Sequence, residues 1–474
     1  MNLVPAKCTE CGANLNVDPG KDTAVCEYCN TPFITVNAIN GCSGNPDFEI
    51  RAGELLKYNG AATRVVIPGS VIKINEKAFE GCELLAEVVI PDSVTEICKD
   101  LFRGLTKLTK VTLSTGITRI GEAAFAYCIR LTAIAIPDSV KSIGESAFWN
   151  CASLTEITIP SSVAKIETNT FMGCISLTSV RIPSSVTKIE KSAFNDCKSL
   201  PAITIPKSVK SIGERAFESC EKLTSIAILG SIAKIEGNAF AFCTSLVAIA
   251  IPDGVTSIEA GAFMGCEALT SVTIPNSVTS IGLGAFRNCT KLPSITIPDS
   301  VTDIEEDAFF ECTGLASVKL PNRIEWIKKN AFYRCKSLTS ITIPNKVIGI
   351  LSGAFADCKS LTSVTISNSV GRIKSYAFAS CTSLTSITIP GSVKWVEENA
   401  FKDCSKLEEV ITTCPREPTV YYTKWFHVCF QGTPFGELVK QRHKEGKCVA
   451  CGGKFGGLIT KKCKECGALK EFEE

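Results

Sequence analysis

A phenylalanine recurs every 23 residues through most of this chain. Fifteen of them keep that spacing without a slip: Phe79, Phe102, Phe125, Phe148, Phe171, Phe194, Phe217, Phe240, Phe263, Phe286, Phe309, Phe332, Phe355, Phe378 and Phe401. A fixed period held over so long a stretch is typical of a solenoid, in which each repeat forms one turn of a stack. It disfavours an enzyme, because a repeated surface offers rows of similar side chains instead of one convergent site.

When the repeats are aligned, each position of the repeat forms a column of equivalent residues. The other columns predict how one coil is built. Ile157 and Ile159 are two residues apart, so they share one face of a short strand, with Thr158 on the other face. Proline follows this strand in most repeats and marks its end, because proline lacks the N–H that a ladder needs. A single 23-residue coil cannot bury its own apolar side chains, but stacked coils can. We therefore expect a mainly β solenoid of about 15 coils with parallel strands.

Taken together, the columns resemble a known repeat. The pattern Leu-x-x-Ile-x-Ile-Pro-x-x-Val-x-x-Ile-Gly-x-x-Ala-Phe-x-x-Cys runs through about residues 65–412 and resembles the BspA-like leucine-rich repeat family. The resemblance implies a right-handed, curved leucine-rich-repeat solenoid and a role in binding other macromolecules. Many members look like cell-surface proteins with a secretory signal, and this chain departs from them at its termini.

Eight cysteines near the two ends form Cys-x₂-Cys pairs. They are Cys8, Cys11, Cys26 and Cys29, then Cys448, Cys451, Cys463 and Cys466. Two such pairs can aim four thiolates at one point, in the tetrahedral arrangement that suits Zn²⁺. The sequence therefore predicts a zinc ribbon at each end, with a structural site that leaves no position for a catalytic water. The alternative, a thioredoxin-type redox pair, lacks a βαβ context and would not need two pairs per segment.

Most of the other cysteines belong to the repeat. Fourteen fill one column, from Cys82 to Cys404, and Leu105 stands in the one remaining repeat. Leucine there indicates a small buried apolar slot, where free cysteine is common. A metal or redox role is the alternative, but ligands come in clusters and these residues form a line. We assign no role to the four cysteines that fit neither pattern: Cys42, Cys98, Cys414 and Cys429.

These motifs divide the chain into five segments. We expect an N-terminal zinc ribbon over 1–36, a linker over 37–46, the solenoid over 47–412, a cap and linker helix over 413–446, and a C-terminal ribbon over 447–474. The terminal coil needs a cap, because its unpaired strand edge and apolar face would otherwise promote aggregation. Four aromatic residues of the cap supply the apolar area: Tyr421, Tyr422, Trp425 and Phe426.

Location and catalysis are predicted from what the sequence lacks. The first residues show no basic region followed by an apolar stretch, and no run approaches the roughly 18 apolar residues that span a membrane. Because the thiolate sites also need reduced cysteines, we expect a cytoplasmic protein. With two histidines, His427 and His443, and no phosphate loop or nucleophile elbow, we expect no enzyme. The two histidines remain alternative metal ligands.

Binding to another macromolecule is the remaining function. A net charge of +2 disfavours nucleic acid and favours a protein partner, whose identity the sequence does not give. The C-terminal ribbon is locally basic, however. A nucleic-acid-associated protein that uses its ribbons, with the solenoid recruiting partners, is therefore the alternative.

The columns of the repeat differ in what they offer a partner. The outward strand positions are mostly Ser, Thr and Ala, without the aromatic and Arg anchors of a binding hot spot. The column directly after each Phe is more varied. It holds large side chains in two pairs of adjacent repeats, which are our candidate partner contacts: Trp149 with Met172, and Phe310 with Tyr333. Partial burial under neighbouring loops is the alternative, and Trp326 and Trp395 occupy a separate turn column.

Overall fold

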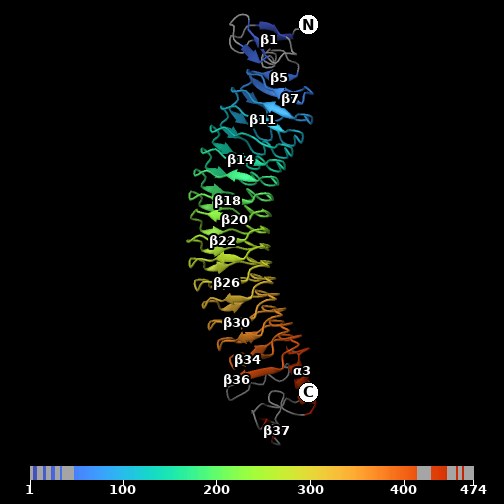
Figure 1. The fold of residues 1–474 in the computed structure, drawn as a ribbon, viewed down its shortest axis with the longest axis vertical. Helices are drawn as coiled ribbons and strands as arrows, with labels where there is room; N and C mark the ends of the chain where they lie inside the picture. The colour runs from blue at the N-terminus through green and yellow to red at the C-terminus, as the bar shows by residue number, and fades with distance from the viewer. Residues whose placement is uncertain are drawn as a thin grey trace. The chain divides into compact units, whose positions relative to one another are not determined.

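The computed structural model describes residues 4–7, 14–17, 23–26, 32–34, 47–413, 429–445, 455–456 and 462–463. The chain divides into two compact units, Met1–Gly230 and Ser231–Glu474. Within each unit the strands follow one another in chain order (Figure 1). The predicted parallel-stranded solenoid is confirmed in both units.

The first unit stacks its coils through two rows of short strands. The first row holds the Ile-x-Ile part of the repeat: β7 (Arg64–Val66), β9 (Glu87–Val89), β11 (Lys110–Thr112), β14 (Glu156–Thr158), β16 (Ser179–Arg181), β18 (Ala202–Ile205) and β20 (Ser225–Ile228). The second row lies just before the Phe turn: β8 (Lys73–Ile74), β10 (Glu96–Ile97), β12 (Arg119–Ile120), β13 (Ser142–Ile143), β15 (Lys165–Ile166), β17 (Lys188–Ile189) and β19 (Ser211–Ile212). Partners are one repeat apart, so Ile157 lies opposite Val180 in a parallel ladder.

The second unit repeats this plan. Its first row consists of β22 (Ala248–Ala250), β24 (Ser271–Thr273), β26 (Ser294–Thr296), β28 (Ser317–Lys319), β30 (Ser340–Thr342), β32 (Ser363–Thr365), β34 (Ser386–Pro390) and β36 (Glu409–Thr413). Its second row consists of β21 (Lys234–Ile235), β23 (Ser257–Ile258), β25 (Ser280–Ile281), β27 (Asp303–Ile304), β29 (Trp326–Ile327), β31 (Gly349–Ile350), β33 (Arg372–Ile373) and β35 (Trp395–Val396). The strands of the second row were not expected from the sequence.

Short antiparallel hairpins lie in the segments where ribbons are predicted. β1 (Val4–Lys7) pairs with β2 (Asn14–Val17), and β3 (Thr23–Val25) pairs with β4 (Pro32–Ile34). Near the other end, β37 (Phe455–Gly456) pairs with β38 (Lys462–Cys463). Another hairpin, β5 (Phe48–Arg51) with β6 (Glu54–Tyr58), starts the stack, and β6 continues as a parallel partner of β8.

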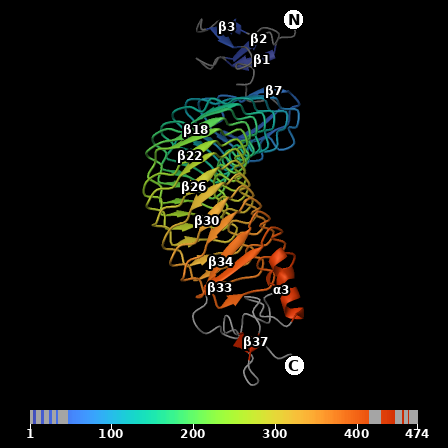
Figure 2. The ribbon, with the colours of Figure 1, turned by 60° about the horizontal axis from the view of Figure 1, so that its bottom comes forward.

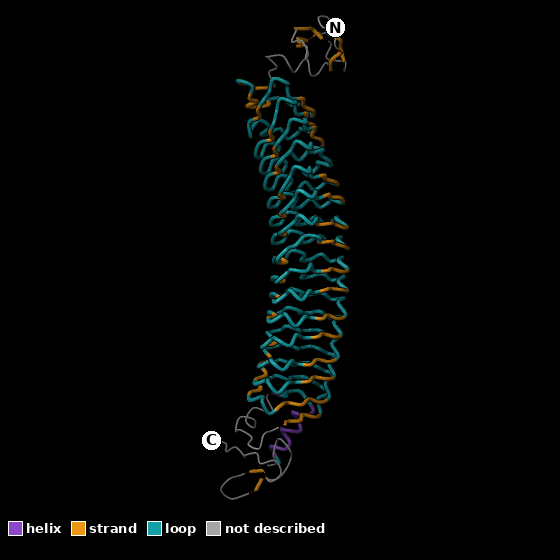
Figure 3. The backbone as a smooth tube through the Cα atoms, turned by 90° about the vertical axis from the view of Figure 1, so that its left-hand side faces the viewer, coloured by secondary structure: helices purple, strands orange, loops and turns teal. Residues whose placement is uncertain are grey.

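The core of each unit is a ladder of phenylalanine rings. Neighbouring rings lie 5.3 to 5.6 Å apart between centroids in the first unit, and 5.2 to 5.6 Å apart in the second. Most pairs are stacked, and the rings are essentially inaccessible to solvent. Strands occupy only a small part of each coil, and the rest is turn (Figure 3). The coils are therefore held by this apolar column and by hydrogen bonds between turns, such as Phe309 N–H to the Ala331 carbonyl.

Aromatic residues outside the repeat extend the ladder at both ends. Tyr58 packs on Phe79 with centroids 6.0 Å apart. At the other end, Phe430 stacks on Phe401 at 4.9 Å, just before helix α3 (Pro434–Lys444), which lies beside the last coils (Figure 2). The backbone N–H of Phe401 also donates to the Cys429 carbonyl. Among the described residues Phe430 covers the last ring, whereas the four aromatic residues predicted to do so lie outside the described residues.

Candidate functional site

Phe310 and Tyr333 form a stacked aromatic pair on the surface of the second unit. Their ring centroids are 4.8 Å apart, with an angle of 20° between the ring planes. Both side chains are half-buried. The structure thus brings this predicted pair together, and such stacking contributes about 0.5 to 1.5 kcal/mol beyond the burial of area.

Two arginines cover the faces of this pair. Arg287 lies 4.1 Å from the centre of the Phe310 ring, and Arg334 lies 5.5 Å from the centre of the Tyr333 ring. Both guanidinium groups are already neutralised. Arg287 pairs with Asp307 at 3.2 Å, and Arg334 pairs with two carboxylates, Glu311 at 2.7 Å and Asp357 at 3.2 Å. The pair therefore provides an apolar area that a partner could contact. Around it lies a polar rim in which the positive charges are paired with negative ones, which is the usual layout of a protein interface.

A shallow groove of about 400 Å³ begins at Tyr333. Small residues of the next coils, Gly353, Ala356 and Ala379, line it together with Tyr376. Tyr376 is 45% exposed. The groove exists because the residue directly after the Phe changes from large to small along the stack. Tyr333 occupies this position in one coil, and Ala356 and Ala379 occupy it in the next two coils.

Tyr376 and Phe242 are surface aromatics that the sequence analysis missed. Both have a left-handed backbone, with φ of 59° and 57°. The same columns in other repeats hold mostly Asn, Asp, Ser and Gly, which adopt this conformation more readily. A bulky side chain costs about 1 kcal/mol or more there, so an aromatic in those columns is the signal that could have revealed them. We call Phe242, Phe310, Tyr333 and Tyr376 the aromatic edge.

The other predicted pair, Trp149 with Met172, is arranged differently. Both side chains are half-buried, but the ring contact of Trp149 is with Tyr127 of the preceding coil, at 4.8 Å between centroids. Tyr127 is another aromatic in the left-handed conformation, with φ of 62°. The link to Met172 is a backbone one, in which Asn150 N–H donates to the Met172 carbonyl at 2.7 Å.

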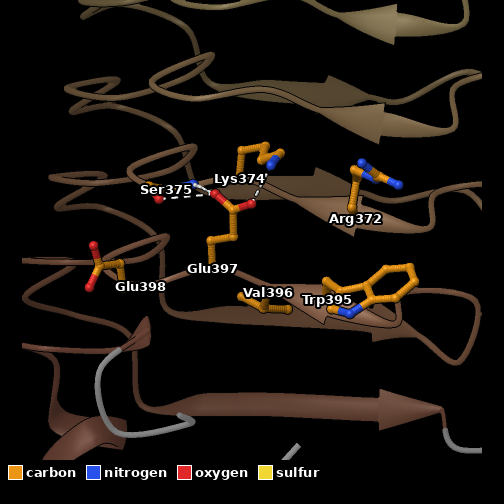
Figure 4. Close-up of a pocket in the computed structure, with 7 residues that line it drawn as sticks. All are labelled: Arg372, Lys374, Ser375, Trp395, Val396, Glu397 and Glu398. Carbon is orange, nitrogen blue, oxygen red and sulfur yellow. Dashed lines mark hydrogen bonds and ion pairs between the residues drawn. The ribbon is translucent and has the colours of Figure 1, made fainter. Parts of the chain in front are cut away.

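Trp326 and Trp395 lie on second-row strands, β29 and β35, so their placement in a turn column was wrong. Trp395 is 51% exposed and lines a hollow of about 570 Å³ together with Arg372, Lys374, Ser375, Val396, Glu397 and Glu398 (Figure 4). The repeat pattern did not predict this hollow, because its lining residues come from two neighbouring coils and the pattern does not show how their side chains combine.

The predicted metal ligands fall mainly on residues that the structure does not describe. The backbone of Cys463 is described at the end of β38, and among the eight cysteines the side chain is described only for Cys26, which is fully buried. Within the described segments, no three His, Cys, Asp or Glu side chains come close enough to hold a metal ion. No helix among the described residues is long and apolar enough to cross a membrane.

The cysteine column lies inside the stack. Thirteen of its fourteen members are buried, and Cys82 is half-buried. Most of the thiols donate to the carbonyl oxygen of a Phe one coil earlier, as Cys174 does to Phe148 at 3.2 Å. Burial raises the pKa of the Cys174 thiol to about 12, so it stays protonated. The column therefore has a structural part in the fold, as a set of small hydrogen-bonding core residues. Cys98 and Cys429, which had no predicted role, make similar bonds to Ile74 and Val396, each 3.2 Å long.

Comparison with known proteins identifies the repeat. A family model described as "BspA type Leucine rich repeat region (6 copies)" matches residues 54–178, 164–293 and 279–408. A solved leucine-rich repeat protein from Bacteroides ovatus is 29% identical, covers 77% of this chain and 85% of its own length, and has a TM-score of 0.55. A leucine rich cell surface protein from Faecalibacterium prausnitzii is 30% identical over 81% of this chain and 96% of its own, with a TM-score of 0.46. No curated protein matches. Repeat columns, stacked coils and the family model agree: the chain belongs to the BspA-type leucine-rich repeat family.

Proposed function

We propose that this chain is a non-enzymatic scaffold that binds another protein at the aromatic edge of its second unit. The observation that carries the proposal is the stack of Phe310 on Tyr333, beside a groove whose lining includes a glycine and two alanines. A few large aromatic side chains usually supply most of the binding energy of an interface. The groove gives a partner's side chain a place to enter next to them.

The repeated strand face makes a poorer site. In β28 and β30 the outward residues are Ser317, Lys319, Ser340 and Thr342, all exposed and mostly small. Small hydroxyl side chains bury little area, and the residues that dominate hot spots are absent from these two strands. The contrast within the same coils favours the aromatic edge.

Two structural zinc ions are part of the proposal. In the sequence, Cys8 and Cys11 fall between the paired strands β1 and β2, and Cys29 falls between β3 and β4. Two hairpins that carry Cys-x₂-Cys connections suit a four-thiolate site, and the buried side chain of Cys26 is compatible with it. The ions would hold the ribbons folded, since four thiolates leave no position for a reacting water. Because these thiolates must stay reduced, we place the protein in the cytoplasm.

Quantitative capture tests the proposed surface. Partners are captured from the native cell on immobilised full-length protein and identified by mass, and the strongest is then purified. We expect the double variant Phe310→Ala/Tyr333→Ala to bind that partner more weakly by at least about 1 kcal/mol. The matched control, Ser317→Ala/Ser340→Ala, changes the strand face of nearly the same coils and should bind normally. Equal binding by the aromatic variant would move the site elsewhere.

A further inference from the structure

Arg372 lies between two tryptophans on the second row of strands. In the ladder β29-β31-β33-β35, Trp326 is opposite Gly349, Gly349 is opposite Arg372, and Arg372 is opposite Trp395. The guanidinium carbon is 6.0 Å from the centre of the Trp326 ring and 5.6 Å from the centre of the Trp395 ring. Contacts with two aromatic faces hold the arginine in place without using its N–H groups.

Gly349 makes this arrangement possible. A Cβ atom at that position would lie 2.5 Å from Cζ3 of Trp326 and 3.0 Å from Cγ of Arg372. Such distances are too short for carbon atoms, so any other residue would displace the indole. Trp326 can therefore reach across β31 towards Arg372 only because a glycine separates them.

The guanidinium of Arg372 differs from the neighbouring cation Lys374 in having no acidic partner among the described residues. Lys374 pairs with Glu397, whose carboxylate also accepts hydrogen bonds from the backbone N–H and the hydroxyl of Ser375, each 3.1 Å long. Glu398 lies on the far side of Glu397 (Figure 4). Within the segments that the structure describes, no carboxylate forms an ion pair with Arg372, whereas Arg287 and Arg334 both have one. Its N–H groups can therefore donate hydrogen bonds to an anionic ligand.

We propose that this hollow binds a segment of a partner protein that carries a carboxylate beside an apolar side chain. A partner carboxylate would accept two hydrogen bonds from Arg372, and a neighbouring apolar side chain would pack on the exposed Trp395 ring. The volume of about 570 Å³ is large enough for both side chains. The proposal uses none of the residues of the aromatic edge, so it stands or falls independently of the site proposed there.

The charges around the hollow favour one carboxylate over a polyanion. Its lining carries two cationic side chains, Arg372 and Lys374, and two anionic ones, Glu397 and Glu398, so the charges sum to zero. A nucleic acid needs a basic surface, which this lining does not provide. One unpaired guanidinium matches one carboxylate, since Lys374 is already neutralised by Glu397.

Fluorescence anisotropy with labelled peptides tests the site on the full-length protein. The probe is a short peptide in which two glutamates flank a leucine, and its counterparts carry glutamine or phosphoserine in place of glutamate. We expect the glutamate peptide to bind, and the glutamine peptide to bind at least about tenfold more weakly. The variants Arg372→Gln and Trp395→Ala should each weaken binding of the glutamate peptide by a similar factor.

Arg119→Gln is the matched control. Arg119 occupies the same row of the repeat in the first unit and pairs with Glu96 at 3.3 Å, so its loss should leave peptide binding unchanged. Thermal unfolding of each variant checks that the fold is intact. The proposal is overturned if the glutamate peptide does not bind at millimolar concentration, or if Arg372→Gln binds it as well as the unchanged protein. Tighter binding of the phosphoserine peptide, or of a single-stranded oligonucleotide in an Arg372-dependent manner, would also contradict the carboxylate assignment.

Discussion

Phe309 and Phe310 are consecutive in the chain but belong to different regions of the molecule. Phe309 is fully buried and stacks between Phe286 and Phe332, as most rings in its column stack on their neighbours. Phe310 is half-buried and stacks on Tyr333, in a column whose other members include alanine, glutamate, lysine, arginine, asparagine, methionine and tryptophan. The first column repeats because stacking requires the same shape in every coil. The second column is free to vary, so its aromatic residues call for another explanation, and we propose that this explanation is binding.

Truncating the buried ring should have the largest effect. Phe309→Ala leaves a cavity between two stacked coils and should destabilise the second unit by about 3 to 5 kcal/mol. Equilibrium unfolding in denaturant measures this loss. A loss below 1 kcal/mol would mean that the phenylalanine ladder does not hold the coils together.

Removing a predicted zinc ligand should act only at one end of the chain. The purified protein should carry two zinc ions, and Cys8→Ser should carry one, with the stack still folded because each coil depends on its neighbours. Metal analysis by mass spectrometry under reducing conditions gives the count, and circular dichroism reports the stack. Cys174→Ser is the control, since it changes a buried cysteine of the repeat and should keep both ions. A protein without metal would refute the ribbon sites.

The buried cysteines predict a loss of stability at alkaline pH. Burial raises the pKa of the Cys128 and Cys174 thiols from 9.0 to about 12. Between pH 9 and 12 the unfolded chain releases these protons while the folded chain keeps them, so the free energy of unfolding falls as the pH rises through this window. Below pH 9 these groups should contribute no pH dependence. Denaturant unfolding at a series of pH values measures the slope, and Cys174→Ala should make it less steep.

The aromatic edge should contribute least to stability. Phe310→Ala/Tyr333→Ala removes one surface stack and two half-buried rings, so it should lower the free energy of unfolding by less than the about 3 to 5 kcal/mol expected of Phe309→Ala. The comparison with Phe309→Ala, made in the same denaturant, separates the two regions directly. A loss as large as that of Phe309→Ala would assign the pair to the core, and the argument for binding would fail.

The sequence was sufficient for the stack because the stack repeats. The spacing of two between Ile157 and Ile159 predicted the first row of strands, and the Phe column predicted the core. The second row was missed because each of its strands is only two residues long, as in Lys165–Ile166, which is too short for an alternating pattern. The first-row pairing of Ile157 with Val180 needed no more than the period.

The candidate sites were predicted less completely, because they depend on contacts between different columns. Phe310 and Tyr333 share a column, so their contact could be predicted from the 23-residue spacing alone. Trp149 instead contacts Tyr127, which belongs to a different column: Trp149 directly follows its Phe, whereas Tyr127 is two residues after its Phe. The period does not show which side chains of neighbouring coils contact each other. The approach of Trp326 to Arg372 across Gly349 spans three coils and required the structure.

Photo-cross-linking tests most directly whether the partner is bound by the varied columns or by the repeated ones. The photoreactive residue p-benzoylphenylalanine is placed at Tyr333 in one protein and at Ser340 of strand β30 in another, and each is irradiated with the purified partner. Both positions lie in the same part of the second unit, but one is on the aromatic edge and the other on the exposed strand face. We predict a covalent adduct from position 333 and none from position 340. An adduct from position 340 alone would contradict the account, because the repeated strand face would then be the binding surface.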